Sequence, residues 1–289
     1  MKRIVRDQGF VLVAPLILLV LLIVLLPQLW SIILSFTDYR LGAPIVFRGL
    51  NTYKTVLKDP QFWNAAERNL IFVVCVVSLE VGGGLLISLL LFRGFRFQKL
   101  WVALVLAPYA ISPAVAAAIW KYLLDYSMGP VNWVLSSIGV GRLPWLFNPS
   151  LALVSVMVVY VWQAMPFSVI ILYSALIALP REVYEAASLD GATSFQCFRY
   201  VTLPLLSPVL LVVIIFRLII SFRAFGHIWA LTRGGPMFKT ELLSLYLYRQ
   251  GFRYWNFAMA SAVGTLMLIL TLLITSYFIY DSYKRRFAQ

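Results

Sequence analysis

Six long apolar stretches constrain what this chain can fold into more than any other feature. They lie at residues 10–36, 69–92, 100–124, 151–179, 205–231 and 257–280. About 20 apolar residues in an α-helix cross a hydrocarbon layer of about 30 Å, so each stretch is long enough to span a bilayer. Helices are expected because lipid cannot satisfy free backbone groups, and the stretches are too long for barrel strands. The sequence therefore predicts an all-α membrane protein with six transmembrane helices.

The intervals between these stretches leave no room for a separate soluble domain. The longest of them, 37–68 and 126–150, are only loop-sized. We therefore expect residues 1–289 to form a single transmembrane domain. The first stretch follows Lys2 and Arg3 but continues without a small-residue cleavage site, so we interpret it as an uncleaved span and not as a secretion signal.

Clusters of basic residues predict the orientation in the membrane. They are Lys2, Arg3 and Arg6; Arg93, Arg96 and Lys99; and Lys284, Arg285 and Arg286. The positive-inside rule places these clusters in the cytoplasm. The loops on the opposite side carry a similar total number of basic residues. The orientation is therefore favoured by how densely the bases are clustered, and not by the number of bases on each side. An even number of spans then places both termini, and the loop 181–204, in the cytoplasm.

The residue inventory argues against several kinds of active centre. The net charge of +13 comes from bases scattered over every loop, so nucleic-acid binding is not expected. Cys75 and Cys197 sit at different depths, and the single histidine, His227, cannot build a metal site alone. Gly82-Gly83-Gly84 is too short and too deep for a phosphate loop, and no G-x-x-x-x-G-K-[ST] occurs. We expect no catalytic residue, metal or cofactor in this chain, so any ATP is hydrolysed by another polypeptide.

An organised polar loop, residues 181–204, separates the fourth and fifth stretches. Good helix formers fill 181–190, and Glu182 and Glu185 lie early, where the helix dipole favours negative charge. The loop therefore predicts a short helix over 181–190. That helix would present the small side chains of Ala186-Ala187 to a partner.

The second half of this loop predicts another short helix. Gly191 is expected to reverse the chain, because glycine adopts a left-handed backbone without strain. The helix over 193–201 would place Phe195 and Phe198 on one face, anchored to the membrane domain. Leu203-Pro204 is expected to close it.

The loop resembles the EAA loop of the membrane subunits of ABC importers, most closely in the sugar-permease branch. The resemblance rests on the joint spacing of Glu185, Asp190-Gly191 and Leu203-Pro204. It implies the type I ABC-importer transmembrane fold and a coupling helix that docks in a cleft of an ATPase subunit. Glu185 would pair with a base of the ATPase, and Asp190 and Gly191 would shape the bend. The implied coupling residues are Glu185, Ala186, Ala187, Asp190, Gly191, Leu203 and Pro204.

Other segments extend the resemblance over nearly the whole chain. They are Phe47–Tyr53 with Phe62-Trp63, then Pro108-Tyr109 with Pro113 and Trp120, and Leu231–Pro236. One position departs from the family. An acid usually follows the phenylalanine that corresponds to Phe225, and this chain has Gly226 there. The resemblance therefore carries no acid-dependent contact over to this stretch.

The resemblance also implies a larger assembly. We expect a homologous second permease, two ATPase subunits that bind ATP and Mg, and an extracytoplasmic solute-binding protein. The outer loops, including 126–148 and 233–255, would receive that binding protein. The expected function is import of a sugar or sugar-like solute across a bacterial or archaeal plasma membrane. Importers of several sugars share these motifs, so they do not name the sugar.

Four ionisable residues lie within the apolar stretches: Glu80, Arg217, Arg223 and His227. On insertion scales a charge at the centre of a bilayer costs about 2.5–3.5 kcal/mol, so each of them needs a reason. Some could line a water-filled path. Alternatively, the central Glu80 and Arg217 pair to stabilise helix packing, and the other two reach toward the membrane surface.

The fourth stretch carries a stripe of residues at helical spacing. The stripe is Tyr160, Gln163, Phe167, Ile171 and Ser174. Sugars need aromatic faces for their C–H surfaces and amide or hydroxyl groups for their hydroxyls. In the family that the chain resembles, the pocket is built largely from spans four and five. The expected substrate-pathway residues are Tyr160, Gln163 and Phe167, with Ser221 and Ala224; a core-packing stripe is the alternative.

Two other classes of protein fit the chain less well. A secondary transporter would have internal repeats and discontinuous helices, and residues 1–140 and 141–289 show no convincing repeat. An intramembrane enzyme needs a nucleophile with a base, or metal ligands, within hydrogen-bond reach. One histidine and few acids within the spans make such a centre improbable.

Overall fold

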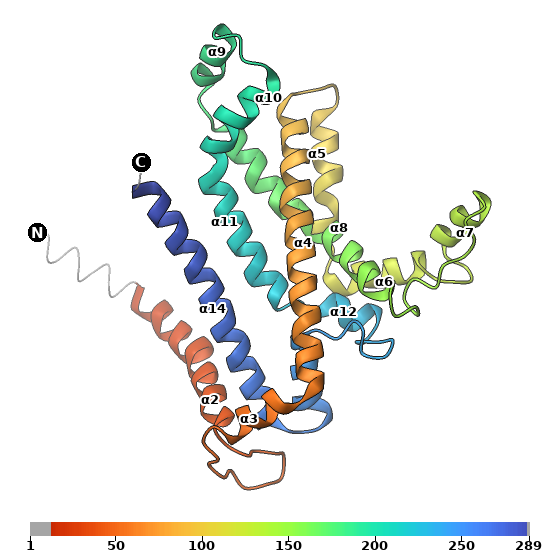
Figure 1. The fold of residues 1–289 in the computed structure, drawn as a ribbon, viewed down its shortest axis with the longest axis vertical. Coiled ribbons are helices and arrows are strands. Elements are labelled where there is room, and N and C mark those ends of the chain that lie inside the picture. The colour runs from red at the N-terminus through yellow and green to blue at the C-terminus, as the bar shows by residue number, and fades with distance from the viewer. Residues whose placement is uncertain (1–12, 288–289) are drawn as a thin grey trace, which may run out of the picture. The chain divides into compact units, whose positions relative to one another are not determined.

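Helices form most of the described chain (Figure 1). The computed structural model describes residues 13–287, with side chains through Tyr280. No strand occurs in this part of the chain, which has only two isolated β-bridges, Thr37–Phe47 and Arg40–Asn256. The following predicted features lie outside the described part: residues 10–12 of the first span, Lys2, Arg3 and Arg6, and the side chains of Lys284, Arg285 and Arg286.

The chain forms two compact units. The first combines the residues up to Trp63 with Tyr246–Leu270, and the second combines Asn64–Leu245 with the residues from Thr271 onward. The first unit holds the helix Val13–Ser35, which ends in α2 (Leu26–Ser35), together with α3 (Asn51–Lys58), the end of α13 (Leu243–Tyr248) and the start of α14 (Phe257–Phe287).

Polar contacts join the segments of the first unit. Tyr246 donates its hydroxyl to Asp59 at 2.6 Å, and Arg249 donates to the side-chain oxygen of Gln61 at 2.8 Å. Burial, followed by the hydrogen bond to Asp59, raises the pKa of Tyr246. The phenol therefore remains a donor at neutral pH.

The second unit contains the helices that build the candidate sites. They are α4 (Pro60–Phe92, from Asn64 onward), α5 (Gln98–Leu106), α6 (Pro113–Leu123), α7 (Pro130–Ser137), α8 (Ala152–Ile177), α9 (Arg181–Leu189), α10 (Ser194–Cys197), α11 (Leu203–Phe222) and α12 (Gly226–Leu231). Helix α8 lies at the centre and contacts α5, α6, α11 and α12. It is apolar on every side, as expected of a helix in the core of a large protein or in a membrane. This helix fills the predicted span 151–179 almost to its ends.

The third apolar stretch is not one straight helix. Helix α5 continues into a 3₁₀ turn, Ala107–Ala110, and this segment meets α6 at an angle of 101°. Ile111 and Ser112 between them are extended. Proline disfavours the helical conformation of the residue before it, and Pro113 is pre-set for the first turn of a new helix. The described part of the chain contains five helices that are long and apolar enough to cross a membrane, or six if this bent pair is one span.

Two further stretches differ from the predicted boundaries. Helix α4 begins at Pro60 and not near residue 69, because its polar first turns carry no hydropathy signal. The predicted helix 205–231 ends at Phe222, and α12 begins at Gly226. Arg223 and Phe225 between them leave helical geometry, with φ of −105° and −135°.

Glycines allow α4 and α8 to pack closely. A Cβ on Gly84 would lie 2.7 Å from the Cβ of Ser168, closer than atoms can pack, whereas a Cβ on Gly82 would meet nothing within 4 Å. Ser88 also donates to the carbonyl of Val169 at 3.2 Å. Small residues that let helix backbones approach are the usual device for joining helices in lipid.

Replacing Gly84 by alanine is expected to lower the stability of the protein by about 1–3 kcal/mol, the usual cost of overpacking. Gly82→Ala is the matched control, because it adds the same methyl to the same helix in open space. Denaturation of the detergent-solubilised protein by SDS measures both variants. Equal midpoints for the two would contradict the close packing of α4 and α8.

Candidate functional site

The turn between α9 and α10 is built as the sequence predicts. Gly191 has φ of +75°. The Ala192 N–H donates to the carbonyl of Ala187 at 3.0 Å, and the Gly191 N–H donates to that of Ser188 at 3.1 Å. These two bonds form a Schellman motif, which ends helices at a left-handed glycine. The predicted bend at Gly191 is confirmed.

The second helix of the loop does not end at Leu203-Pro204. Helix α10 starts at a capping box of Thr193 and Gln196 and continues through a π-helical turn, Phe198–Thr202, into α11. The Leu203 N–H donates to the carbonyl of Phe198, five residues back. This wider turn makes room for the ring of Pro204, which clashes with a carbonyl in a regular α-helix. The expectation that Leu203-Pro204 closes the helix is wrong.

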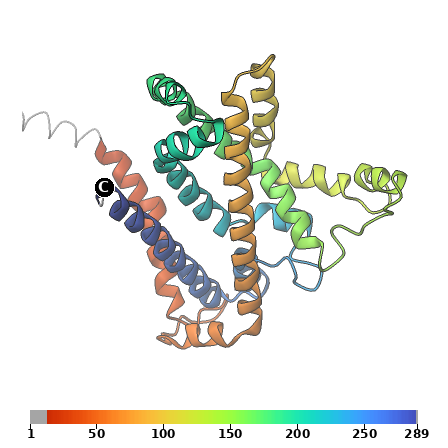
Figure 2. The same ribbon diagram turned by 45° about the horizontal axis from the view of Figure 1, so that its top comes forward.

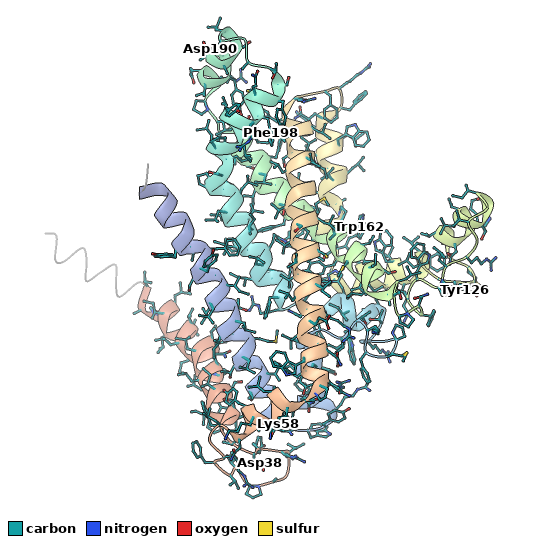
Figure 3. All side chains as sticks on the ribbon, viewed as in Figure 1. Asp38, Lys58, Tyr126, Trp162, Asp190 and Phe198 are labelled. Carbon is teal, nitrogen blue, oxygen red and sulfur yellow. The ribbon has the colours of Figure 1, made fainter. Side chains whose placement is uncertain are left out.

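Only part of the predicted anchor faces the membrane helices. Phe198 is half-buried, but Phe195 is 73% exposed. The second aromatic anchor is Tyr184, whose ring lies 5.9 Å from that of Phe92 and whose hydroxyl lies 3.2 Å from that of Thr202. The prediction of a paired Phe195–Phe198 anchor is therefore wrong for Phe195. Figure 3 shows Asp190 at the tip of this loop and Phe198 nearer to the helices.

The outer surface of the loop is open to a partner. Glu185, Ala186, Asp190 and Gly191 are exposed, whereas Ala187 is half-buried. Ala187 lines a cavity of about 350 Å³ between the loop and the end of α4. Of the two predicted alanines, only Ala186 is therefore fully presented.

The loop and the first internal basic cluster lie at one end of the second unit. Figures 1 and 2 both show α9 and α10 beside the connection from α4 to α5. Arg93, at the start of that connection, lines the same cavity as Tyr184 and Phe198. The loop and this basic cluster, which the sequence predicts on the same side of the membrane, therefore lie together in the structure.

A second cavity lies beside the breaks in the apolar helices. Its volume is about 490 Å³. It is lined by Tyr109, Ile111, Pro113, Tyr160, Gln163, Ala164, Arg217, Ile220, Arg223, Ala224, Phe225, Gly226 and His227. Both interruptions of the apolar helices, at 111–112 and at 223–225, contribute to its wall. Irregular backbone at membrane depth is tolerated where it lines a cavity or is buried in protein.

Gln163 holds three elements of this cavity together. Its amide nitrogen donates to the carbonyl of Ile111 at 2.7 Å, and its oxygen lies 3.1 Å from Nε2 of His227. Since the amide oxygen can only accept, Nε2 of His227 carries the proton. The Tyr160 ring packs edge-on against His227, with 4.9 Å between ring centroids.

The predicted pathway residues divide into two groups. Tyr160, Gln163 and Ala224 line the cavity. Ser221 is buried behind it, where its hydroxyl lies 3.5 Å from that of Tyr160. Phe167 lies outside the lining, with its ring 5.7 Å from the Arg217 guanidinium.

The sequence did not identify the wall formed by Tyr109, Ile111 and Pro113. These residues reach the cavity only because the third stretch bends, and the local signals of that bend are Pro108 and Pro113.

Glu80 and Arg217 form a buried ion pair, which is one of the two alternatives that the sequence left open. Arg217 Nε lies 2.6 Å from one carboxylate oxygen of Glu80, and its Nη2 lies 2.7 Å from the other. The Arg217 side chain is 2% exposed and the Glu80 side chain is 0% exposed. This bidentate geometry is the strongest arrangement of the two groups. It joins α4 to α11 next to the cavity.

Comparison with known proteins identifies the family of this chain. The family model of the binding-protein-dependent transport system inner membrane component matches residues 81–289. The chain belongs to this family. The permease is 35% identical to the trehalose/maltose transport system permease protein MalF of Thermococcus litoralis, over 92% of this chain and 90% of that protein. It is also 35% identical to the diacetylchitobiose uptake system permease protein DasB of Streptomyces coelicolor, over 80% and 72% of the two chains.

A solved structure shares the fold of the permease. A chain of a bacterial ABC transporter involved in the import of the acidic polysaccharide alginate superposes with a TM-score of 0.87, covering 98% of each chain at 24% identity. The expected all-α fold of a type I ABC-importer permease is confirmed. The protein is the membrane permease component of an ABC transport system.

Proposed function

We propose that this permease imports a sugar or glycoside, driven by two ATPase subunits that bind ATP and Mg. A homologous second permease completes the pathway, and an extracytoplasmic binding protein delivers the solute. The names of the two relatives, a trehalose/maltose permease and a diacetylchitobiose permease, support the substrate class. The family's description supports the binding protein and an inner-membrane location.

The observation that carries this proposal is the exposed outer surface of α9 and α10. No carboxylate of this surface forms an ion pair with a described residue, although Glu185 and Asp190 both project from it. The helix pair is held from behind by Tyr184 and Phe198, so its outer side remains free to enter a cleft. The adjacent Arg93 favours the cytoplasmic side, and both termini are then cytoplasmic.

The cavity has the chemistry that a sugar requires. Tyr109, Tyr160 and Phe225 are aromatic residues of its wall, and the break at 111–112 brings backbone groups to the wall. Closure of the ATPases on ATP would draw the coupling loops of the two permeases together. It would thereby open the cavity to the other side of the membrane, as in other two-state elements biased from a distance.

Transport in proteoliposomes tests this function. The permease pair, the ATPases and the binding protein are reconstituted with ATP enclosed on the ATPase side, and uptake of labelled sugars is measured. We expect uptake that requires ATP and the binding protein. Uptake driven by a sodium or proton gradient without ATPase subunits would contradict the proposal and favour a secondary transporter. The discontinuous helices of the permease make this control necessary.

A further inference from the structure

The wall of the membrane cavity carries positive charge and no described carboxylate. Its two permanently charged side chains are Arg217 and Arg223, both from α11 or its end. The lining from the 3₁₀ turn Ala107–Ala110, α6 and α8 is aromatic, aliphatic or amide, and α12 contributes Gly226 and His227. Described residues of five segments therefore face this space, and none of them is Asp or Glu.

The two arginines differ in how their charge is balanced. Arg217 is 2% exposed and is neutralised by the bidentate contact with Glu80. Arg223 is exposed, and no described carboxylate lies within ion-pair distance of it. Arg223 therefore supplies the uncompensated positive charge of the cavity.

The position of Arg223 suits it to meet a ligand. It follows the last residue of α11, where the chain leaves helical geometry before α12 begins. A guanidinium offers a planar fork of donors that matches an oxyanion in two parallel hydrogen bonds. The aromatic residues on the same wall, Tyr109, Tyr160 and Phe225, suit the sugar ring that would carry this oxyanion.

We infer that the solute carried by this permease is an acidic sugar, whose carboxylate, phosphate or sulfonate group is bound by Arg223. The inference rests on the proposed function, because it names the class of sugar that passes through the same cavity. A neutral sugar would leave the Arg223 charge without a counter-charge among the described residues. An anionic sugar supplies that counter-charge.

A structural role for Arg223 predicts something different. A cation at the end of a helix stabilises the helix dipole, and Arg223 caps α11. Loss of that effect would weaken the transport of every sugar alike. The ratio of acidic to neutral sugar transported therefore separates the two roles.

The experiment measures competitive uptake by the reconstituted importer, without a membrane potential. The acidic probes are digalacturonate, glucose 6-phosphate and sulfoquinovose. The neutral counterpart of digalacturonate is its carboxyl-reduced form, and the neutral counterpart of the other two is glucose. All probes are supplied at equal concentration and identified inside the vesicles by mass spectrometry. Wild type is expected to accumulate one of the acidic probes in preference to its neutral counterpart. The acidic probe that accumulates distinguishes carboxylate, phosphate and sulfonate.

Arg223→Gln is expected to lower the ratio of acidic to neutral uptake by about 10- to 100-fold, the effect of losing a charge-assisted hydrogen bond. Arg223→Lys should restore part of the ratio. Arg96→Gln is the matched control, because it removes an exposed arginine that lies outside the cavity lining and outside the loops expected to receive the binding protein, and it should leave the ratio unchanged.

Two outcomes overturn the inference while the proposed function stands. In one, wild type takes up neutral sugars with ATP and excludes all the acidic probes. In the other, Arg223→Gln lowers acidic and neutral uptake equally, which assigns Arg223 to the end of α11. Absence of ATP-dependent uptake of any probe counts against the proposed function, and against this inference with it.

Discussion

Glu185→Lys is expected to abolish the stimulation of ATP hydrolysis by substrate and to abolish uptake. Glu185 is exposed on α9, and no described residue forms an ion pair with it. If it pairs with a base of the ATPase, charge reversal turns an attraction into a repulsion in a desolvated contact. Removing one partner of such a pair costs about 2–5 kcal/mol of association free energy. That range corresponds to a loss of affinity of about 30-fold to a few thousand-fold.

Two measurements separate a coupling defect from misfolding. Size-exclusion chromatography of the detergent-solubilised Glu185→Lys permease should match wild type, because the side chain supports no internal contact of the described structure. Glu67→Lys is the control for net charge, since Glu67 is equally exposed but lies near the other end of α4, away from α9. Glu185→Gln should give an intermediate defect. Normal substrate-stimulated hydrolysis by Glu185→Lys would contradict a coupling role for this carboxylate.

The parts of the fold that rest on local signals could be predicted from the sequence. Helix α8 fills its apolar stretch almost to the ends, because the stretch is long and apolar on every side, and Pro166 does not interrupt it. The bend after α9 follows from Gly191, which takes the left-handed conformation that the Schellman turn requires. In both cases one short segment contains the whole cause.

The breaks that shape the cavity could not be predicted in the same way. Hydropathy adds up apolar residues and carries no information on the direction of the backbone. Pro113 begins a new helix, yet Pro166 and Pro208 lie inside continuous helices. The same residue type therefore marks a break in one stretch and none in two others. Neighbouring helices decide the outcome, and their positions are a property of the tertiary structure.

The contact of Glu80 with Arg217 also depends on tertiary structure, and the second large effect is expected there. Arg217→Gln leaves the Glu80 carboxylate in a site with no exposed surface. Breaking a buried pair by removing one partner costs about 3–5 kcal/mol, because the remaining charge is uncompensated. We expect this loss in the free energy of unfolding, measured by SDS denaturation of the detergent-solubilised permease.

The double variant Glu80→Gln, Arg217→Gln tests the cause of that loss. It removes both charges and keeps two side chains that can hydrogen-bond to each other. Replacing a buried pair by a neutral one is often nearly neutral for stability, so the double variant should recover most of the loss. If the single and double variants were equally destabilised, the effect would come from lost side-chain volume and not from an unpaired charge.

If the double variant recovers most of the stability, stability alone does not explain why a charged pair joins α4 to α11. Transport by the double variant tests what else the pair does. Helix α4 meets the α9–α10 loop through Phe92 and Tyr184, and Arg217 and Arg223, in α11 and directly after it, line the cavity. The pair thus holds α4 and α11 together between the α9–α10 loop and the cavity. A neutral amide pair lacks the bidentate geometry that fixes the two helices in one register. We therefore expect the double variant to fold, and an importer reconstituted with it to hydrolyse ATP but to move fewer solute molecules per ATP than the wild-type importer. An unchanged ratio of transport to hydrolysis would limit the pair to a role in packing.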